Sequence, residues 1–111
     1  MASEGFHEPI QELKQQTREM HRAIVSLMEE LEAIDWYQQR VDAATDDDLR
    51  VILAHNRDEE KEHAAMVLEW IRRHDPAFDA QLKKYLFTTS PITDRGDEAE
   101  PQSPGGKRWT G

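Results

Sequence analysis

The sequence predicts an all-α chain: an antiparallel two-helix hairpin with a short C-terminal helix, dimerising into a four-helix bundle. Three observations support this. Apolar residues recur at alternating spacings of three and four over two long stretches, the period of a helix with one apolar face. Neither stretch contains an internal glycine or proline. Two helices alone cannot enclose a core, so their apolar faces need a partner.

The first helix is predicted to begin at Pro9, which suits a first helical turn, and to run to about Gln38. Its apolar face is a heptad line with one polar member. This line, called the first stripe, consists of Ile10, Leu13, Thr17, Met20, Ile24, Leu27, Leu31 and Ile34.

The segment "VDAATDDD", residues 41–48, is predicted to connect the two long helices. Thr45 is the expected N-cap of the second helix, with Asp48 completing a variant capping box. The second helix carries a line at the same spacing, called the second stripe. It consists of Leu49, Leu53, Asn56, Glu60, His63, Val67 and Trp70.

Asp75 and Pro76 end the second helix and start a short third one. Its apolar face is expected to contain Phe78, Leu82, and either Tyr85 or Leu86. Residues 88–111 are rich in proline and glycine and poor in large apolar groups, which is typical of a disordered tail. We therefore expect one folded helical domain, residues 1–87, followed by this tail.

Composition narrows the possible partners. The net charge of −9 argues against nucleic acid and is compatible with cations. The 111 residues contain no cysteine, which excludes disulfides and thiolate metal sites and fits a cytoplasmic location. No apolar run approaches the roughly 18 residues of a membrane span, and the N-terminus lacks a signal-peptide pattern, so no membrane association is expected.

The small folded region favours self-association, because a lone hairpin core would be marginal. A dimer or larger homo-oligomer is the expected solution. The alternative is a monomeric hairpin covered by its third helix and tail.

The second stripe is interrupted by three consecutive polar members, Asn56, Glu60 and His63. Glu60 and His63 are three residues apart and share one helix face. Glu30 borders the first stripe. One Glu from one helix and Glu-x-x-His from the other is half of the ligand set of di-iron carboxylate bundles, and two copies would complete it. The alternative is a Glu60–His63 pair that only fixes helix register.

Carboxylate and imidazole ligands suit iron or manganese, and the spacing does not choose between them. Two iron ions per dimer interface would form an open site at which O2 oxidises Fe(II). A dinuclear manganese or zinc protein is an alternative.

Three segments together resemble the encapsulated ferritins, the ferritin-like cargo of bacterial encapsulin compartments. They are "HRAIVSLMEELEAIDWYQQR", "LAHNRDEEKEHAAMVLEWIRR" and "KYLFT", and the resemblance covers about residues 7–92. It implies a ferritin-like four-helix site formed by two protomers, five such dimers in a decameric ring, and ferroxidase activity. It also implies that ferric iron passes to an encapsulin shell for storage, inside a nanocompartment in the bacterial cytoplasm.

The resemblance also implies residue roles. Glu30, Glu60 and His63 would be the iron ligands of the ferroxidase centre, with Tyr37 beside it. The region through which metal enters would contain Glu29, Glu32 and Trp36. A secondary metal site would contain His55, Glu59 and Glu62. Without the resemblance, these acidic residues are equally typical of a solvated helix face, and Trp36 of packing.

One feature departs from the pattern. Cargo of this type commonly ends in a short apolar address containing Gly-Ser-Leu, whereas this sequence ends "SPGGKRWTG". The expected function is a ferroxidase supplying iron to a shell. The alternative is a non-catalytic helical assembly module with a structural metal site.

Overall fold

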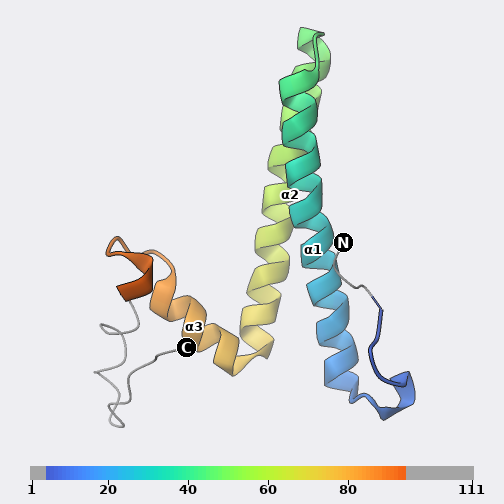
Figure 1. Cartoon of the computed structure of the whole chain (residues 1–111), viewed down its shortest axis with the longest axis vertical. Helices are drawn as coiled ribbons and strands as arrows, with labels where there is room; N and C mark the ends of the chain where they lie inside the picture. Colours follow the sequence, from blue (N-terminus) through green and yellow to red (C-terminus); the bar gives the residue numbers. More distant parts are fainter. Residues whose placement is uncertain (1–4, 95–111) are drawn as a thin grey trace. The chain divides into compact units, whose positions relative to one another are not determined.

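A computed structural model describes residues 5–94, and the expected all-α architecture is confirmed there. Two long helices, α1 (Gln15–Ala43) and α2 (Asp47–His74), form an antiparallel hairpin, and α3 (Pro76–Tyr85) follows (Figure 1). Short 3-10 turns lie at Ile10–Glu12 and Ile92–Asp94. No strand occurs in this part of the chain, and none of its helices is long and apolar enough to cross a membrane.

The chain divides into two compact units between Ile71 and Arg72. The first unit contains the hairpin, and the second contains α3. The predicted domain boundary at residue 87 stays a prediction. Residues 88–94 of the predicted tail contain the second 3-10 turn, and its remainder lies outside the described residues.

The first helix differs from the prediction at both ends. The chain turns at Leu13 and Lys14, which have extended backbone angles, so α1 begins at Gln15 rather than Pro9. This turn lets the N-terminal arm fold back, where the Phe6 ring lies 4.4 Å from the His21 ring. At the other end α1 continues to Ala43, because residues 39–43 contain no helix breaker.

The predicted N-cap of the second helix is wrong. The carboxylate of Asp46, not the hydroxyl of Thr45, accepts the backbone N–H of Leu49 at 2.8 Å. The longer α1 leaves only residues 44–46 as the connection, which places Asp46 directly before the helix. Such a short connection enforces antiparallel neighbours.

Arg50 closes this connection. Its guanidinium donates hydrogen bonds to the backbone carbonyls of Val41 and Ala44, and it pairs with Asp47 at 2.9 Å. These carbonyls lie at the C-terminal end of α1, where backbone acceptors lack helical partners. Arg50 therefore joins the end of α1 to the start of α2.

The first stripe divides into two sets, whose first members, Ile10 and Leu13, lie before α1. Leu13, Met20, Leu27 and Ile34 are half-buried, whereas Ile10, Thr17, Ile24 and Leu31 are exposed. Within α1 the members of each set are seven residues apart, so each set lies on one side of the helix. One side of α1 is therefore half-buried, and the other remains exposed.

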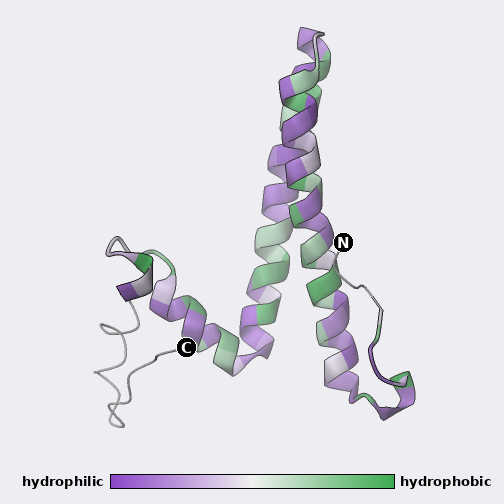
Figure 2. Cartoon of the chain, in the orientation of Figure 1, coloured by the Kyte–Doolittle hydropathy of each residue, from purple (hydrophilic) through white to green (hydrophobic). Residues whose placement is uncertain are grey.

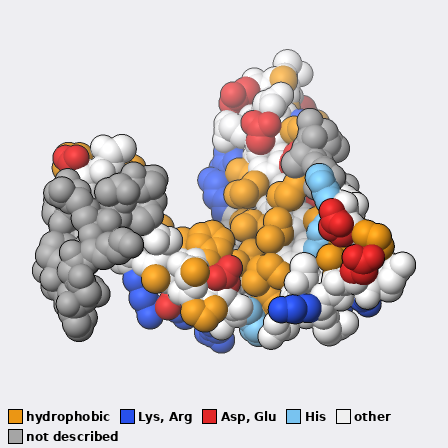
Figure 3. Space-filling view, turned by 60° about the horizontal axis from the view of Figure 1, so that its bottom comes forward, with side chains coloured by type: hydrophobic (Ala, Val, Ile, Leu, Met, Phe, Trp, Pro, Cys, Tyr) orange, Lys and Arg blue, Asp and Glu red, His pale blue; other side chains and the backbone are white. Residues whose placement is uncertain are grey.

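Apolar side chains therefore remain exposed on the hairpin (Figure 3). Ile24, Leu31, Ile52 and Met66 are 44%, 53%, 56% and 58% exposed. The only buried apolar residues in the described part are Ala64 and Ile71. Figure 2 shows hydrophilic and hydrophobic residues interleaved along both hairpin helices. The hairpin buries few of its own apolar groups.

In the second unit, α3 begins as predicted. Pro76 occupies its first turn, and the carboxylate of Asp75 accepts the backbone N–H of Phe78 at 3.0 Å. Asp79 pairs with Arg72 at 2.5 Å and with Lys83 at 3.0 Å. The Arg72 hydrogen bond, followed by that of Lys83, holds the pKa of the Asp79 carboxyl below its usual range.

We expect Asp79 to make the stability of this unit depend on pH. A carboxyl whose pKa is lower in the folded than in the unfolded state stabilises the fold at pH values above the ordinary Asp pKa of about 4. This stabilisation is lost as the pH falls through the pKa of the folded state. The thermal unfolding midpoint of Asp79→Asn should therefore lie below that of the parent at neutral pH and converge with it in acid. Asp94→Asn, at an exposed aspartate of the same unit, is the control. An undiminished gap in acid would contradict this.

Candidate metal centre

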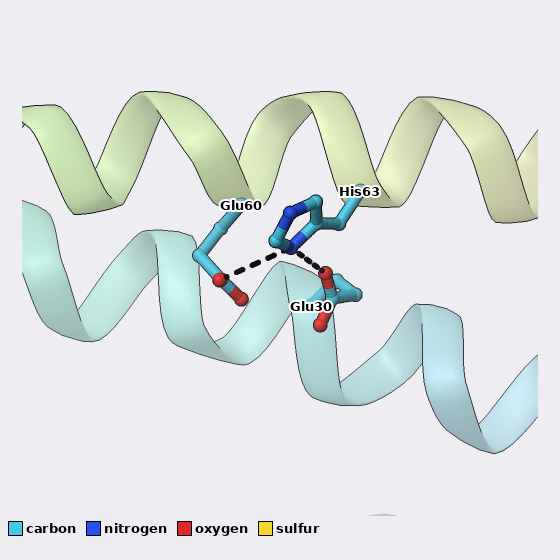
Figure 4. Close-up of side chains that lie close together, drawn as sticks. All are labelled: Glu30, Glu60 and His63. Carbon is cyan, nitrogen blue, oxygen red and sulfur yellow. Dashed lines mark ion pairs between the residues drawn. The ribbon is translucent and has the colours of Figure 1, made fainter.

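Three potential metal ligands meet in the hairpin, Glu30 from α1 and Glu60 and His63 from α2 (Figure 4). One ligand atom from each lies within 4.8 Å of the others. This is the only such group of three among residues 5–94. The sequence grouped the same residues, because Glu30 borders the first stripe and the other two belong to the second.

The His63 Nδ1 atom lies between the two carboxylates. It is 3.0 Å from Glu30 Oε2 and 3.3 Å from Glu60 Oε1. The side chains of Glu30 and Glu60 are only 22% and 19% exposed, and that of His63 is 44% exposed. The imidazole is thus the most open member of the group.

Glu30 Oε2 is buried and has no hydrogen-bond partner, even though His63 Nδ1 is close. A buried carboxylate oxygen that makes no hydrogen bond is costly, because it has lost water. A cation bound between the three groups would satisfy this oxygen. Two carboxylates and one imidazole fit a ferrous or manganous ion.

The local sequence explains how α2 presents these groups. The spacing of three residues puts Glu60 and His63 on the helix face that also carries Leu53 and Val67. All four are half-buried. Two half-buried apolar residues therefore flank the polar pair along this face.

Tyr37 is half-buried, and the Arg40 guanidinium lies 5.1 Å from the centre of its ring. Neighbouring Trp36 is 50% exposed. Neither residue belongs to the three-ligand group. Their predicted places, beside the centre and in the region through which metal enters, stay predictions.

The remaining predicted metal residues do not come together in a single chain. Glu29 is exposed and Glu32 half-buried, and all three residues of the predicted secondary site are exposed. That site consists of His55, Glu59 and Glu62. No group of three in the described part includes any of these residues. Both roles stay predictions.

Two polar residues near the centre were not predicted from the sequence. Arg57 donates from Nη1 to Gln38 Oε1 across the hairpin at 2.8 Å. Arg57 also bonds Asp58 on its own helix at 3.0 Å, and this contact lowers the pKa of the Asp58 carboxyl. A signal was present, since Gln38 follows Ile34 by four residues and therefore lies on the same helix face.

Comparison with known proteins identifies relatives over most of the chain. The family model described as EncFtn-like matches residues 5–89. The crystal structure of protein ne0167 from Nitrosomonas europaea is similar, with a TM-score of 0.77 and 70% identity. The similarity covers 79% of this chain and 97% of that one.

Three curated proteins are also similar. The encapsulated ferritin-like protein of Rhodospirillum rubrum is 64% identical over 83% of this chain and 66% of its own length. The ferritin-like protein of Thermotoga maritima is 50% identical over 98% and 92%. The encapsulin nanocompartment cargo protein EncC of Myxococcus xanthus is 40% identical over 73% and 66%. The chain thus matches about two thirds of the length of the first and third.

We expect Glu30→Gln to have opposite effects on the stability of the metal-free chain and on its stabilisation by metal. Without metal, the change removes one of two converging negative charges, so the unfolding midpoint should stay equal or rise. With anaerobic Fe(II), the parent should be stabilised by about 2.7 kcal/mol at a hundredfold excess over Kd, and the variant by much less.

Scanning calorimetry with and without metal measures both effects. Asp35→Asn is the matched control, since it removes an exposed carboxylate of the same helix that has no proposed metal role. Equal metal stabilisation of Glu30→Gln and the parent would place the metal elsewhere.

Proposed function

We propose that this chain, which belongs to the EncFtn-like family, oxidises Fe(II) to Fe(III) with O2 at a dinuclear iron site completed by two copies. The observation that carries the proposal is the convergence of Glu30, Glu60 and His63 with a buried, unsatisfied carboxylate oxygen. Ferrous iron is the substrate, and each ion gives one electron to O2.

The charges of the ligand set suit this chemistry. Each chain contributes two carboxylates and one imidazole, so two copies contribute four carboxylates and two imidazoles. Four negative charges balance two divalent ions. Anionic oxygen ligands stabilise the more highly charged ferric ion more strongly, which favours loss of an electron.

Exposed apolar residues on the hairpin favour the binding of a second copy beside the centre. Leu31 is exposed on the turn next to Glu30, and Met66 is exposed three residues after His63. A partner packed there would bury apolar groups worth about 25 cal/mol per Å² of apolar area. The His63 side chain is 44% exposed, which leaves it accessible to ligands from a partner.

The remaining site residues are proposed to serve the same path. Exposed or partly exposed Glu29, Glu32 and Trp36 would draw Fe(II) inward through their local field and guide it to the centre. Tyr37, beneath the Arg40 guanidinium, would line the centre. The secondary metal site would bind ions on the outward-facing surface, with His55, Glu59 and Glu62 as its ligands.

The destination of the iron is proposed from the relatives. The names of the Rhodospirillum and Myxococcus proteins describe encapsulated and encapsulin-cargo proteins. By that likeness we propose that this chain works inside an encapsulin nanocompartment of the bacterial cytoplasm, as a decameric ring feeding ferric iron to the shell for storage. Neither nucleic acid nor a membrane is a proposed partner.

Loss of a ligand should abolish turnover. We expect Glu60→Ala and His63→Ala each to reduce O2-dependent Fe(II) oxidation by at least tenfold. Absorbance of ferric iron and oxygen consumption, with Fe(II) in excess over sites, measure the effect. Asp48→Ala removes an exposed carboxylate of the same helix that has no proposed metal role, and it should leave the rate within about twofold.

Excess Fe(II) also separates an enzyme from an assembly module with a structural metal. The enzyme oxidises many ions per site, whereas a structural site binds once and stops. Near-parental rates in both ligand variants would show that the chemistry lies elsewhere.

Iron should also promote association. A site that only the dimer completes links metal binding to assembly, so anaerobic Fe(II) should shift the mass distribution toward dimers and larger rings. Native mass spectrometry at several chain concentrations checks this. His63→Ala should respond much less, and a parent chain whose mass distribution ignores Fe(II) would refute the shared site.

A further inference from the structure

We propose that the hydrogen bond between Arg57 and Gln38 positions the metal centre, by fixing α1 against α2 and by holding the Arg57 cation away from Glu60. The inference rests on the proposed function. Both residues lie in the hairpin unit. The role is one of positioning, since neither residue belongs to the ligand group.

The bond is directional and specified at both ends. Gln38 uses its whole amide: its oxygen accepts from Arg57 Nη1 at 2.8 Å, and its nitrogen donates to Asp42 on the same helix at 2.9 Å. The Arg57 side chain is only 20% exposed, and its other nitrogens bond Asp58. The planar guanidinium therefore has one orientation in which all these contacts form.

The centre depends on how α1 lies against α2. Glu30 is eight residues before Gln38, about 12 Å along α1, and His63 is six residues after Arg57, about 9 Å along α2. The ligand atoms lie within 4.8 Å of one another, less than the roughly 5.4 Å of one helical turn. A shift of even about 1 Å can cost a site a hundredfold in rate.

Apart from the Glu30–His63 ion pair of the centre itself, the contacts between the two helices constrain such small shifts less. The connection at residues 44–46 and the Arg50 contacts set the register at the hairpin tip, but Glu30 lies thirteen residues from the end of α1, about 20 Å away. Apolar contacts along the stripes are not directional, so they resist sliding and rotation weakly. The Arg57–Gln38 bond is a directional contact between the tip and the centre.

The same hydrogen bond also determines where the positive charge of Arg57 lies. Arg57 and Glu60 are three residues apart on α2 and can form an ion pair on one face of the helix. The structure instead directs the guanidinium to Gln38 and Asp58. Released from Gln38, Arg57 would compete with Fe(II) for the Glu60 carboxylate.

These two effects predict a specific pattern in a double-mutant cycle. Gln38→Met, at an exposed residue, should raise the Co(II) dissociation constant and the half-saturating Fe(II) concentration about tenfold. It should also change the visible Co(II) spectrum, which reports ligand geometry. Arg57→Met should weaken metal binding less, since it also removes the competing cation. Gln38→Met should then add nothing in the Arg57→Met background.

Gln39→Met is the matched control, because Gln39 bonds Asp35 within α1 rather than across the hairpin. It should change metal affinity less than twofold. Circular dichroism should show the same helix content in every variant, which separates positioning from unfolding.

Two results would overturn the inference: Gln38→Met with parental Co(II) spectrum and affinity, or equal effects of Gln38→Met with and without Arg57. Failure of the parent chain to bind Co(II) at all would instead contradict the proposed metal centre. The two failures are therefore distinguishable.

Discussion

The fold is organised around one electrostatic constraint: two carboxylates and an imidazole are held together in a poorly solvated part of a small hairpin. Each carboxylate repels the other, and burial removes the water that would screen them. Glu30 Oε2 makes no hydrogen bond, and its one reported contact is the ion pair with His63. The metal-free chain therefore retains an unfavourable arrangement that a cation would reverse, which is common where binding geometry takes precedence over stability.

The helical hairpin suits this constraint because its two sides are chemically unequal. A line of residues spaced by three and four contains two sets spaced by seven, and a single partner helix covers only one set. In the first stripe one set is half-buried, while Ile24 and Leu31 of the other remain exposed. Glu30 lies between Leu27 and Leu31, next to both sets. A single chain thus positions its ligands and still presents an apolar surface beside them.

Much of this was predictable from sequence because it depends on local periodicity. The two long helices and the convergence of Glu30, Glu60 and His63 follow from spacing, since residues three or four apart must share a helix face. The Asp75–Pro76 boundary follows from proline, which is favoured in a first helical turn. Features that depend on long side chains were not predictable. Asp46 rather than Thr45 caps α2 because α1 is longer than predicted. The partner of Arg57 depends on where a flexible side chain of four rotatable bonds meets another helix.

If two copies share the centre, association of the chains and binding of iron are thermodynamically coupled. Bringing a second hairpin onto the exposed apolar side gains hydrophobic free energy, but it also brings two further carboxylates toward Glu30 and Glu60. Metal binding removes that repulsion between carboxylates. If metal raises the affinity of the two copies for each other by some factor, association must raise the affinity for iron by the same factor. Directional contacts such as Arg57–Gln38 then matter beyond the single chain. They fix where each copy presents its charges before the partner arrives, and a misplaced half would weaken metal binding and association together.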